Sequence, residues 1–596
     1  MRILGISCFY HDAAAALLVD GVCVAAAEEE RFSRVKHDSR YPELAVAFCL
    51  AHAGIAAAEL DYVVFYEKPL VKFERILTTA MRGFPRAWRA FGEGMVGWFD
   101  EKLWIRALLE KNLGVPREKV LFTEHHAAHA ASAFFCSPFE EAALLTVDGV
   151  GEWTTTASGT ATGAWGPGGT NEIRLTRETR FPHSLGLLYS AFTAFLGFEV
   201  NEGEYKVMGM APYGTPRYQD RVYRLVRVAG DGSFELDMDY FSFQWSTERT
   251  FGRRFTELFG PPRVPGAPFV SALTNPGVDP ARPDVALNQH YADVAASIQR
   301  VTEDILLAMA RALHRETGMS ALCMAGGVAL NSVANGRILR ESGFERVYVQ
   351  PAAGDAGGAL GAALYAWHVL LGKPRGYVME SAYLGAGLSD ADARAFLQAN
   401  GIPFTFYDDP AKLTERLVDD LTRSRVLGWA RGRFEWGPRA LGARSIIADP
   451  RREEMKEVVN EKIKFREPFR PFAPVVPEER AAELFEGLDR PELHHPLRFM
   501  LTVYPWREAA GAAAPAVNHL GTGRLQTVRR EWNPAYFDLV SGFGQATGVP
   551  VLMNTSFNLR GEPIVTTPEQ AFRTFAAGGL DVLVLGSHVV RKDEIS

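Results

Sequence analysis

One pattern of residues occurs twice in this 596-residue sequence and constrains the fold more than any other feature. An apolar run, Asp-Gly and a second strand-like run stand at 13–28, and a related arrangement, "ALLTVDGVGEWTTTAS", stands at 143–158. Asp-Gly between two apolar runs is a strong hairpin signal. The repetition indicates an internal duplication of one α/β unit, although a string as short as V-D-G also recurs by coincidence.

Two strand–glycine–helix units follow farther along the chain. "ALCMAGGVALNSVANGRIL" contains Gly326 and Gly327, and "RVYVQPAAGDAGGALGAALYA" contains Asp355, Gly357 and Gly358. Backbone amides at a helix N-terminus attract phosphate, and glycine permits close approach of a ligand. The sequence has no Walker A pattern, so a P-loop fold is excluded. Hairpins combined with glycine loops before helices favour the nucleotide cleft of the actin/sugar-kinase type.

Two segments look like insertions, and one stretch looks like a domain boundary. Residues 67–110 are rich in aromatic and basic residues; a helical lid or subunit contact suits them better than a membrane-surface helix, because acidic residues interrupt the basic face. Residues 214–290 are irregular and rich in Pro, Gly and Arg, and 292–317 has helical periodicity. The composition changes at 370–376, and a later helix is predicted to begin at Asp449-Pro450.

Three histidines lie within six positions of the run "EHHAAHAASAFF". His125 and His129 are four residues apart and project from one helix face, which suits two imidazoles on one metal ion. Asp148, at the end of the following strand, is a candidate carboxylate ligand. A stacked, hydrogen-bonded core pair is the alternative, and His126 could replace His125 as the partner of His129. The protease motif H-E-x-x-H is absent, because His126 stands where the motif has Glu, and this argues against a zinc protease of that type.

Cations gather in the C-terminal part, within irregular segments stiffened by proline and phenylalanine. "WGPRALGARS" and "NEKIKFREPFRPFAP" supply Arg439, Arg444, Lys462, Lys464, Arg466 and Arg470. Arginine binds phosphate or carboxylate through two parallel hydrogen bonds. Arg524, Asn554 and Ser556 could add further donors. The pattern favours a small-anion site over a plain charged surface.

The net charge of −7 and a pI of about 6.1 weigh against a broad nucleic-acid surface. The five cysteines are scattered and the N-terminus begins directly with strand-like sequence, so we expect a reduced, cytoplasmic protein without a secretory signal. No apolar run is long enough for a transmembrane helix.

Ten ordered motifs, among them "FYHDAAAALLVDG", "HHAAHAASAFFCSPF", "EGEYKVMGMAPYG", "RFEWGPRALGARSI", "KIKFREPFRPFAP" and "MNTSFNLRGEPIV", give the chain a family resemblance. Over nearly its whole length it resembles the nodulation-protein-U type of carbamoyltransferase, a family that includes aminoglycoside, cephamycin and ansamycin carbamoyltransferases. The resemblance implies an α/β protein. Residues 1–370 would form an actin-like, duplicated carbamoyl-transfer domain, and residues 376–596 a YrdC-like domain that makes carbamoyl-adenylate.

The same resemblance implies roles for individual residues. The metal ligands fall on His125, His129, Asp148 and Asp355, and the acceptor-side histidine falls on His11. Lys206 is implied to be catalytic together with His11 and to line the adenylate pocket, which otherwise falls on Gly326, Gly327, Asn331, Gly357 and Gly358. The cradle for carbamoyl phosphate and ATP falls on Arg439, Lys464, Arg470, Arg524, Asn554 and Ser556.

The implied ligands are one divalent metal, ATP with Mg, carbamoyl phosphate and a hydroxyl-bearing sugar or natural-product acceptor. Fe(II) is the first expectation for the metal, with Mn(II) or Zn(II) as alternatives. We expect no membrane and no nucleic-acid partner, and a homodimer is an open expectation. The alternative function is that of a tRNA-modifying threonylcarbamoyl-type or RNA-binding protein, because both domains resemble tRNA-modification enzymes.

Overall fold

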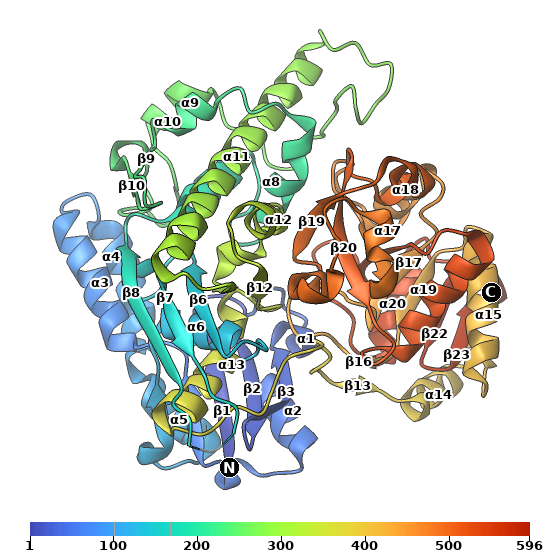
Figure 1. Ribbon diagram of the computed structural model, residues 1–596, viewed down its shortest axis with the longest axis horizontal. Coiled ribbons are helices and arrows are strands. Elements are labelled where there is room, and N and C mark those ends of the chain that lie inside the picture. The colour runs from blue at the N-terminus through green and yellow to red at the C-terminus, as the bar shows by residue number, and fades with distance from the viewer. Residues whose placement is uncertain (101, 167, 596) are drawn as a thin grey trace. The chain divides into compact units, whose positions relative to one another are not determined.

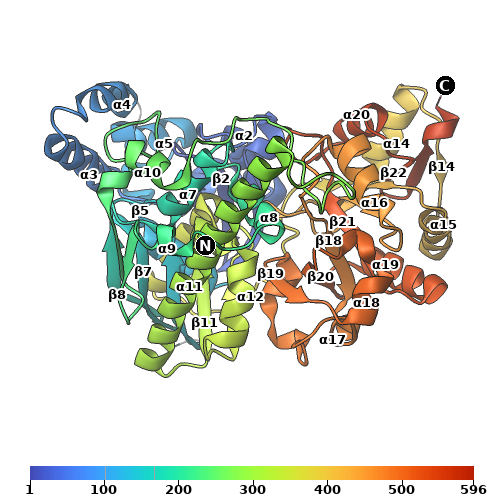
Figure 2. The same cartoon turned by 90° about the horizontal axis from the view of Figure 1, so that it is seen from above.

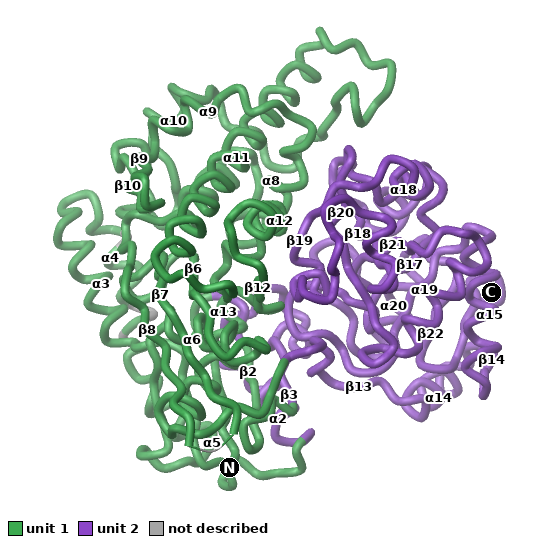
Figure 3. Tube along the Cα trace, in the orientation of Figure 1, with its two compact units in different colours: residues 1–10, 14–24, 53–378 green, residues 11–13, 25–52, 379–596 purple. Residues whose placement is uncertain are grey.

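The computed structural model describes residues 1–100, 102–166 and 168–595, so position 101 of the predicted 67–110 insertion lies outside the described residues. The chain divides into two compact units (Figure 3). The N-terminal unit comprises Met1–Tyr10, Ala14–Val24 and Ala53–Val378, and the C-terminal unit comprises His11–Ala13, Ala25–His52 and Met379–Ser596.

The first sheet of the N-terminal unit has the strand order β3-β2-β1-β4-β5. Its strands are β1 (Arg2–Ser7), β2 (Ala14–Val19), β3 (Val22–Glu28), β4 (Tyr62–Phe65) and β5 (Val120–Phe122). β2 is antiparallel to β1, whereas β4 and β5 continue the sheet in parallel. The predicted hairpin is confirmed: Asp20 and Gly21 both have positive φ, at 49° and 83°, as a two-residue turn requires.

The second sheet has the order β12-β11-β6-β7-β8. Its strands are β6 (Glu141–Val147), β7 (Thr154–Thr162), β8 (Glu172–Arg180), β11 (Ala321–Ala325) and β12 (Arg346–Val349). Three antiparallel strands are again followed by two parallel ones, in the same spatial order as in the first sheet. The repeated topology supports duplication over coincidence, and the N-terminal unit has the actin-like α/β fold.

Two small-residue helices lie between these sheets (Figure 1). α6 (His125–Phe134) contacts the second sheet, and α13 (Asp355–Tyr365) contacts β1, β2 and α6. Their backbones approach closely, because a Cβ on Gly361 of α13 would lie 1.8 Å from the carbonyl oxygen of Ala128 in α6. The alanine-rich sequence of both helices follows from this packing.

The first predicted insertion is helical, as expected, whereas the second contains more regular structure than its composition suggested. α3 (Pro69–Arg82), α4 (Trp88–Asp100) and α5 (Ile105–Leu113) lie in the first; α9 (Gln219–Val222), the β9–β10 pair (Val226–Val228, Phe234–Leu236) and α10 (Arg253–Phe259) lie in the second. The helix predicted at 292–317 is part of the longer α11 (Pro283–Thr317), which begins with proline in its first turn. α7 (Leu185–Phe195), α8 (Glu204–Met210) and α12 (Ser332–Glu341) complete the helices that bear on the site.

The C-terminal unit is built on a nine-stranded mixed sheet of order β14-β23-β22-β15-β17-β21-β18-β20-β19. The strands are β14 (Thr405–Phe406), β15 (Leu427–Ala430), β17 (Arg444–Ala448), β18 (Ala473–Pro477), β19 (Thr502–Pro505), β20 (Thr522–Val528), β21 (Leu552–Ser556), β22 (Val582–Leu585) and β23 (His588–Arg591). Helices α15 (Pro410–Thr422) and α19 (Pro534–Thr547) cover one face; α14 (Asp390–Ala399) and α20 (Pro568–Ala577) cover the other (Figure 2). The fold class is therefore α/β in both units.

Residues 25–52 contribute to the C-terminal unit although they are distant from it in sequence. Arg31 donates to the carbonyl of Gly437 at 2.7 Å, and the amide of Gly437 donates to Glu28 at 2.8 Å. Arg34 donates to the carbonyls of Pro563 and Ile564 at 2.7 and 2.6 Å. The C-terminal unit therefore includes a segment from the N-terminal part of the chain as well as residues after 378.

One predicted helix start is wrong. The helix expected from Asp449-Pro450 begins instead at Glu454 as α16 (Glu454–Glu457) and continues as a π-helix over Val458–Lys464. Asp449 accepts a hydrogen bond from the amide of Arg451 at 2.9 Å and also pairs with its guanidinium, which holds the segment as a turn. Across the described residues, no helix is both long and apolar enough to span a bilayer.

Candidate functional site

The histidine-rich run forms α6, and all of its residues are buried. His125 and His129 are 1% and 0% exposed and project from one face of the helix. The N-terminus of α6 has no side-chain cap of its own; Glu152 provides one by accepting hydrogen bonds from the amide of His125 at 3.1 Å. An external carboxylate therefore stabilises the helix end that carries the first histidine.

Four ligand-type atoms converge at this helix. The Nε2 atoms of His125 and His129 lie 3.0 Å apart. Asp148 Oδ2 lies 3.0 Å from His125 Nε2 and 3.4 Å from His129 Nε2. Asp355 Oδ1 lies 3.6 and 3.9 Å from the same two nitrogens. One ligand atom from each residue lies within 4.8 Å of the other three, and we call these four residues the metal group.

The donor set fits a divalent metal ion. Two atoms each about 2.1 Å from one ion lie about 3.0 Å apart at a right angle and about 3.4 Å apart at the tetrahedral angle. The distances between the two histidines and from each histidine to Asp148 have these values. The Nδ1 atoms of both imidazoles are buried without a hydrogen-bond partner among the described residues, so the polar contacts of both rings are concentrated at Nε2.

Different parts of the fold position the two carboxylates. Asp148 follows β6 in a six-residue connection to β7, and its Oδ1 accepts a hydrogen bond from the amide of Gly327 at 3.0 Å. Asp355 is the first residue of α13, and the Tyr66 hydroxyl donates to its Oδ2 at 3.5 Å. The second Asp-Gly pair of the sequence thus supplies a ligand-type residue, whereas the first forms a tight turn.

The structure decides between the alternatives left open for His126. Its Nδ1 lies 2.8 Å from the hydroxyl of Thr146, and its Nε2 lies 2.9 Å from the carbonyl of Thr154. Both ring nitrogens are therefore occupied away from the metal group. Burial, together with the neighbouring His125 and His129, lowers the pKa of His126 to about 3, so it is a neutral core residue.

Burial and mutual charge together determine the electrostatics of the metal group. Burial alone would lower the pKa of His125, but Asp355 and Asp148 outweigh it and raise the pKa to about 9. Burial opposes ionisation of Asp148, but hydrogen bonds and charges from His125 and His129 hold its pKa well below the usual range. The His125 imidazole and the Asp148 carboxylate thus stabilise each other's charged forms, and a divalent ion would balance the carboxylates in place of the imidazole proton.

The residues expected in an adenylate pocket come from separate elements of the N-terminal unit. Asn331 caps α12 and exchanges hydrogen bonds of 3.0 and 3.1 Å with Gln299. Lys206 lies half-buried on α8, with its ammonium 5.8 Å from the ring centre of Phe198. Neither residue hydrogen-bonds to the metal group within the described part of the chain.

Close packing accounts for the paired glycines. Gly326 has φ of 93°, and a Cβ there would lie 2.2 Å from the carbonyl oxygen of Val147. A Cβ on Gly357 would lie 2.0 Å from the Ala352 oxygen, and one on Gly358 would lie 2.7 Å from the Tyr66 ring.

Three of the four glycine amides donate inside the fold: Gly326 to Ala353, Gly327 to Asp148, and Gly357 to Gly354. Their role as phosphate donors remains a prediction.

His11 belongs to the C-terminal unit and is paired with a carboxylate that the sequence analysis did not assign. Asp12 Oδ2 accepts from His11 Nδ1 at 2.8 Å, and Asp12 Oδ1 accepts from His37 Nδ1 at 2.7 Å. Burial opposes ionisation of Asp12, but the two imidazoles lower its pKa. The signal was the Asp that directly follows His11 in sequence. Asp12, Glu30 and His37 also form a second group that could hold a cation.

The predicted anion cradle is centred on Lys464, which is 5% exposed. Its ammonium donates to the carbonyl and hydroxyl oxygens of Ser556 at 2.7 and 3.3 Å, and to the carbonyl and amide oxygens of Asn558 at 2.9 and 2.5 Å. All four acceptors are neutral. Burial, then the nearby charges of Arg466, Arg470 and Lys36, lower the pKa of Lys464 well below its ordinary value.

Asn554 lies on the same strand as Ser556, which accepts hydrogen bonds from Lys464. Asn554 and Ser556 are two residues apart on β21 and project from one face, as do Arg524 and Gln526 on β20. Asn554 donates to Gln526 at 2.6 Å and to the carbonyl of Ala440, next to Arg439, at 3.0 Å. The polar residues that the sequence analysis missed here are Lys36, Gln526 and Asn558.

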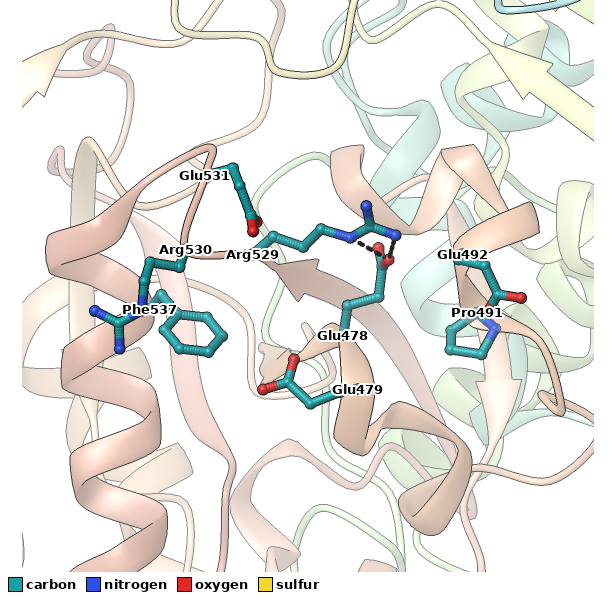
Figure 4. A pocket seen from close by; sticks show the side chains of 8 residues that line it. All are labelled: Glu478, Glu479, Pro491, Glu492, Arg529, Arg530, Glu531 and Phe537. Atoms are coloured by element: carbon teal, nitrogen blue, oxygen red, sulfur yellow. Dashed lines mark hydrogen bonds and ion pairs between the residues drawn. The ribbon is translucent and has the colours of Figure 1, made fainter.

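A pocket of about 510 Å³ in the C-terminal unit contains none of the predicted residues (Figure 4). It is lined by Glu478, Glu479, Pro491, Glu492, Arg529, Arg530, Glu531 and Phe537. Arg529 pairs with the buried Glu478, with a distance of 2.5 Å from Nε to Oε1. The charges of Arg529 and Glu478 in the lining therefore compensate each other. None of the predicted cradle residues lines this pocket.

Known proteins resemble this chain over nearly its full length. The protein sll1178 of Synechocystis sp. is 45% identical over 99% of this chain and 97% of its own. The nodulation protein NolNO of Sinorhizobium fredii is 36% identical over 98% of this chain and 79% of its own.

Among solved structures, component A of the (R)-2-hydroxyglutaryl-CoA dehydratase of Acidaminococcus fermentans is 15% identical, covers 61% of this chain and 97% of its own, and has a TM-score of 0.32, too low to support a conclusion.

Two family descriptions match the sequence. Residues 2–364 match the one described as "Carbamoyltransferase N-terminus", and residues 418–592 match "Carbamoyltransferase C-terminus". These ranges include the metal group and the whole of the predicted cradle. The chain therefore belongs to the carbamoyltransferase family.

Proposed function

We propose that the chain is an ATP-dependent O-carbamoyltransferase with carbamoyl phosphate as donor and a hydroxyl group of a sugar or natural product as acceptor. Residues 376–596 would form carbamoyl-adenylate, and residues 1–370 would hold the activated carbamoyl group for transfer. The full reaction consumes carbamoyl phosphate, ATP, water and the acceptor alcohol, and yields the carbamate ester, phosphate, pyrophosphate and AMP.

The observation that carries the proposal is the charge balance around Lys464. Its buried ammonium has only neutral acceptors, and Arg466, Arg470 and Lys36 raise the positive potential there. A buried cation is costly unless an anion or several hydrogen bonds compensate it. Carbamoyl phosphate and the phosphates of ATP are anions of suitable size, and Arg439 and Arg524 are further cations of the predicted cradle.

The metal group supports the transfer half of the proposal. His125, His129, Asp148 and Asp355 would hold one divalent ion, which when bound polarises a carbonyl group and favours attack on it. The hard oxygen donors and the absence of thiolate suit Fe(II), Mn(II) or Zn(II), and Fe(II) is our first expectation. The residues of the adenylate pocket, Lys206, Gly326, Gly327, Asn331, Gly357 and Gly358, would bind the nucleotide portion.

His11 would act on the acceptor. A carboxylate can only accept hydrogen bonds, so the contact with Asp12 assigns a proton to His11 Nδ1 and leaves Nε2 as the basic nitrogen. An imidazole held in that tautomer can remove the proton of an acceptor hydroxyl as its oxygen attacks the carbamoyl carbon.

The test is the stoichiometry of product release. With ATP, carbamoyl phosphate and a panel of sugar acceptors, we expect pyrophosphate to appear only when both ATP and carbamoyl phosphate are present, with phosphate released in equal amount. Without acceptor the release should stop near one equivalent per chain, because the adenylate is retained. Pyrophosphate formation that does not depend on carbamoyl phosphate would overturn the proposal.

A further inference from the structure

Helix α3 buries two of its three cations, Lys72 and Arg75, although an ordinary surface helix turns its charged side chains to solvent. Lys72 and Arg75, one turn apart, are 7% and 8% exposed, whereas Leu70 and Met81 are 71% and 70% exposed. Burying a charge requires compensation. The inward-facing cations of α3 therefore require a partner, and the two of them differ in whether they have one.

Lys72 has a partner that connects α3 to the metal group. Its ammonium lies 2.7 Å from Glu67 Oε2 and 5.1 Å from the ring centre of Tyr10. The same Glu67 oxygen lies 3.9 Å from His125 Nδ1. A chain of three residues thus extends from the inner face of α3 to a ligand of the metal group.

Arg75 has no such partner. It makes no hydrogen bond and no ion pair with any residue that the structure describes, and its Nε is buried and unsatisfied. Its guanidinium carbon lies 5.1 Å from the centre of the Phe181 ring.

Arg75 nevertheless lies one turn from Lys72 on the same buried face of α3, and Lys72 is linked to His125 through Glu67. Burial lowers the pKa of Arg75, although the charges of Tyr10, Glu67 and Glu152 act to raise it. Burial raises the pKa of Tyr10, and so do the fields of Asp355 and Asp148, so Tyr10 experiences both the metal group and Arg75.

We propose that Arg75, assisted by Lys72, binds an anionic oxygen group of the ligand that is held at the metal group. The planar guanidinium fork matches a phosphate or carboxylate group, and an apolar side chain of similar length would fill the same space without the cost of desolvation. This inference rests on the proposed function. The anion has two possible sources: the phosphate of the nucleotide donor, or an acidic group of the acceptor.

The test measures binding by calorimetry on the full chain loaded with its metal. All proteins in the test carry Lys464→Gln, which is expected to weaken anion binding in the C-terminal unit. Arg75→Gln is added to this parent as the test variant. Arg82→Gln is added in its place as the matched control, because Arg82 is an exposed arginine of the same helix. AMP is compared with adenosine, and inorganic phosphate is titrated both alone and with saturating AMP. Binding is read without turnover, so failure of the proposed carbamoyl transfer would not change the result.

If the donor supplies the anion, Arg75→Gln weakens AMP binding about 10- to 100-fold, adenosine binding is unchanged, and phosphate competes with AMP. If the acceptor supplies it, AMP binding is unchanged, and phosphate binds the AMP complex of the parent and of Arg82→Gln but not that of Arg75→Gln. Equal affinities of Arg75→Gln and Arg82→Gln for both AMP and phosphate would overturn the proposal.

A stability measurement separates ligand binding from a structural role. Since Arg75 is unpaired, Arg75→Met should leave the melting temperature of the ligand-free protein unchanged or raise it. A clear fall in melting temperature would show that Arg75 supports the fold instead, which also contradicts the proposal. If Arg75→Gln does not fold, Arg75→Lys retains the charge but loses the fork, and it should weaken binding of the same probe by a smaller factor.

Discussion

Asp148 links the glycine loop to the histidines: its Oδ1 accepts a hydrogen bond from the amide of Gly327 at 3.0 Å, while its Oδ2 lies 3.0 Å from His125 Nε2. The hydrogen bond from the Gly327 amide orients the Asp148 carboxylate. Its other oxygen therefore faces the histidines whether or not a metal ion is bound. Such support of a ligand residue by a backbone donor is typical of metal sites.

Asp148→Asn tests this arrangement. The amide keeps the size of the carboxylate but loses the charge that a divalent ion requires, so we expect metal content to fall at least about tenfold while the circular dichroism spectrum is retained. Asp284→Asn, at an exposed aspartate that pairs with Arg282, is the control. Full metal content in Asp148→Asn, measured by elemental analysis, would show that Asp148 is not a metal ligand.

Metal binding should release protons. The pKa of His125 without metal is raised to about 9 by Asp355 and Asp148 against the effect of burial, so the imidazole is largely protonated at pH 7.5 and must lose its proton to bind. Calorimetry in buffers of different ionisation enthalpy should show about one proton released per ion. Affinity for the metal should rise with pH up to about 9. Proton-independent binding would contradict the assignment of His125.

The same shift predicts how the stability of the metal-free protein depends on pH. The folded-state pKa of His125 lies above its unfolded value of about 6.5, so this contribution is fully present below pH 6.5 and is lost as pH rises toward 9. The free energy of unfolding should fall across that window by about 2–3 kcal/mol. Urea denaturation of metal-free protein at pH 6 and 9 measures it. His125→Gln should remove most of the dependence; an unchanged dependence in that variant would contradict the explanation.

Lys464 and Lys462 form a matched pair within one π-helix, since Lys464 is buried and Lys462 is exposed. Lys464→Gln removes a buried charge-assisted contact to the anionic substrate, worth about 1.5–3 kcal/mol, so pyrophosphate release at subsaturating carbamoyl phosphate should fall about 10- to 100-fold. Lys462→Gln should remain near wild type. Comparable losses in the two variants would show that general surface charge is responsible.

Gly361→Ala tests the contact between α6 and α13. The added Cβ would lie 1.8 Å from the carbonyl oxygen of Ala128, so the helices must separate, and overpacking of this kind costs about 1–3 kcal/mol. Gly354→Ala is the control, because its Cβ would meet nothing within 4 Å. Thermal unfolding should show a lower melting temperature only for Gly361→Ala. Equal melting temperatures would mean that the two helices are not held as closely as the structure shows.

The sequence predicted what depends on local pattern. The Asp20-Gly21 hairpin was predicted because the turn residues are adjacent, and the facing of His125 and His129 follows from helical spacing alone. It could not choose between His125 and His126, since the choice depends on Thr146 and the carbonyl of Thr154 on neighbouring strands.

Contacts between distant parts of the chain were the hardest to predict. Residues 25–52 belong to the C-terminal unit through contacts such as that of Arg31 with Gly437. These residues are far apart in the sequence, so no local sequence pattern predicts the contact. The false helix start at Asp449 had good capping chemistry, but the side chain of Asp449 pairs with Arg451 instead. A local propensity was overridden there by a nearby ionic contact.

The central claim is that one chain carries out two chemically separate steps. The most direct test supplies synthetic carbamoyl-adenylate, together with an alcohol that the wild-type protein carbamoylates, to Arg470→Ala and His125→Ala. We expect Arg470→Ala to lose pyrophosphate release from carbamoyl phosphate and ATP, but to recover carbamate formation when the adenylate is supplied. His125→Ala should retain pyrophosphate release and form no carbamate from either source. Identical behaviour of the two variants, with both rescued or both inactive, would contradict the account.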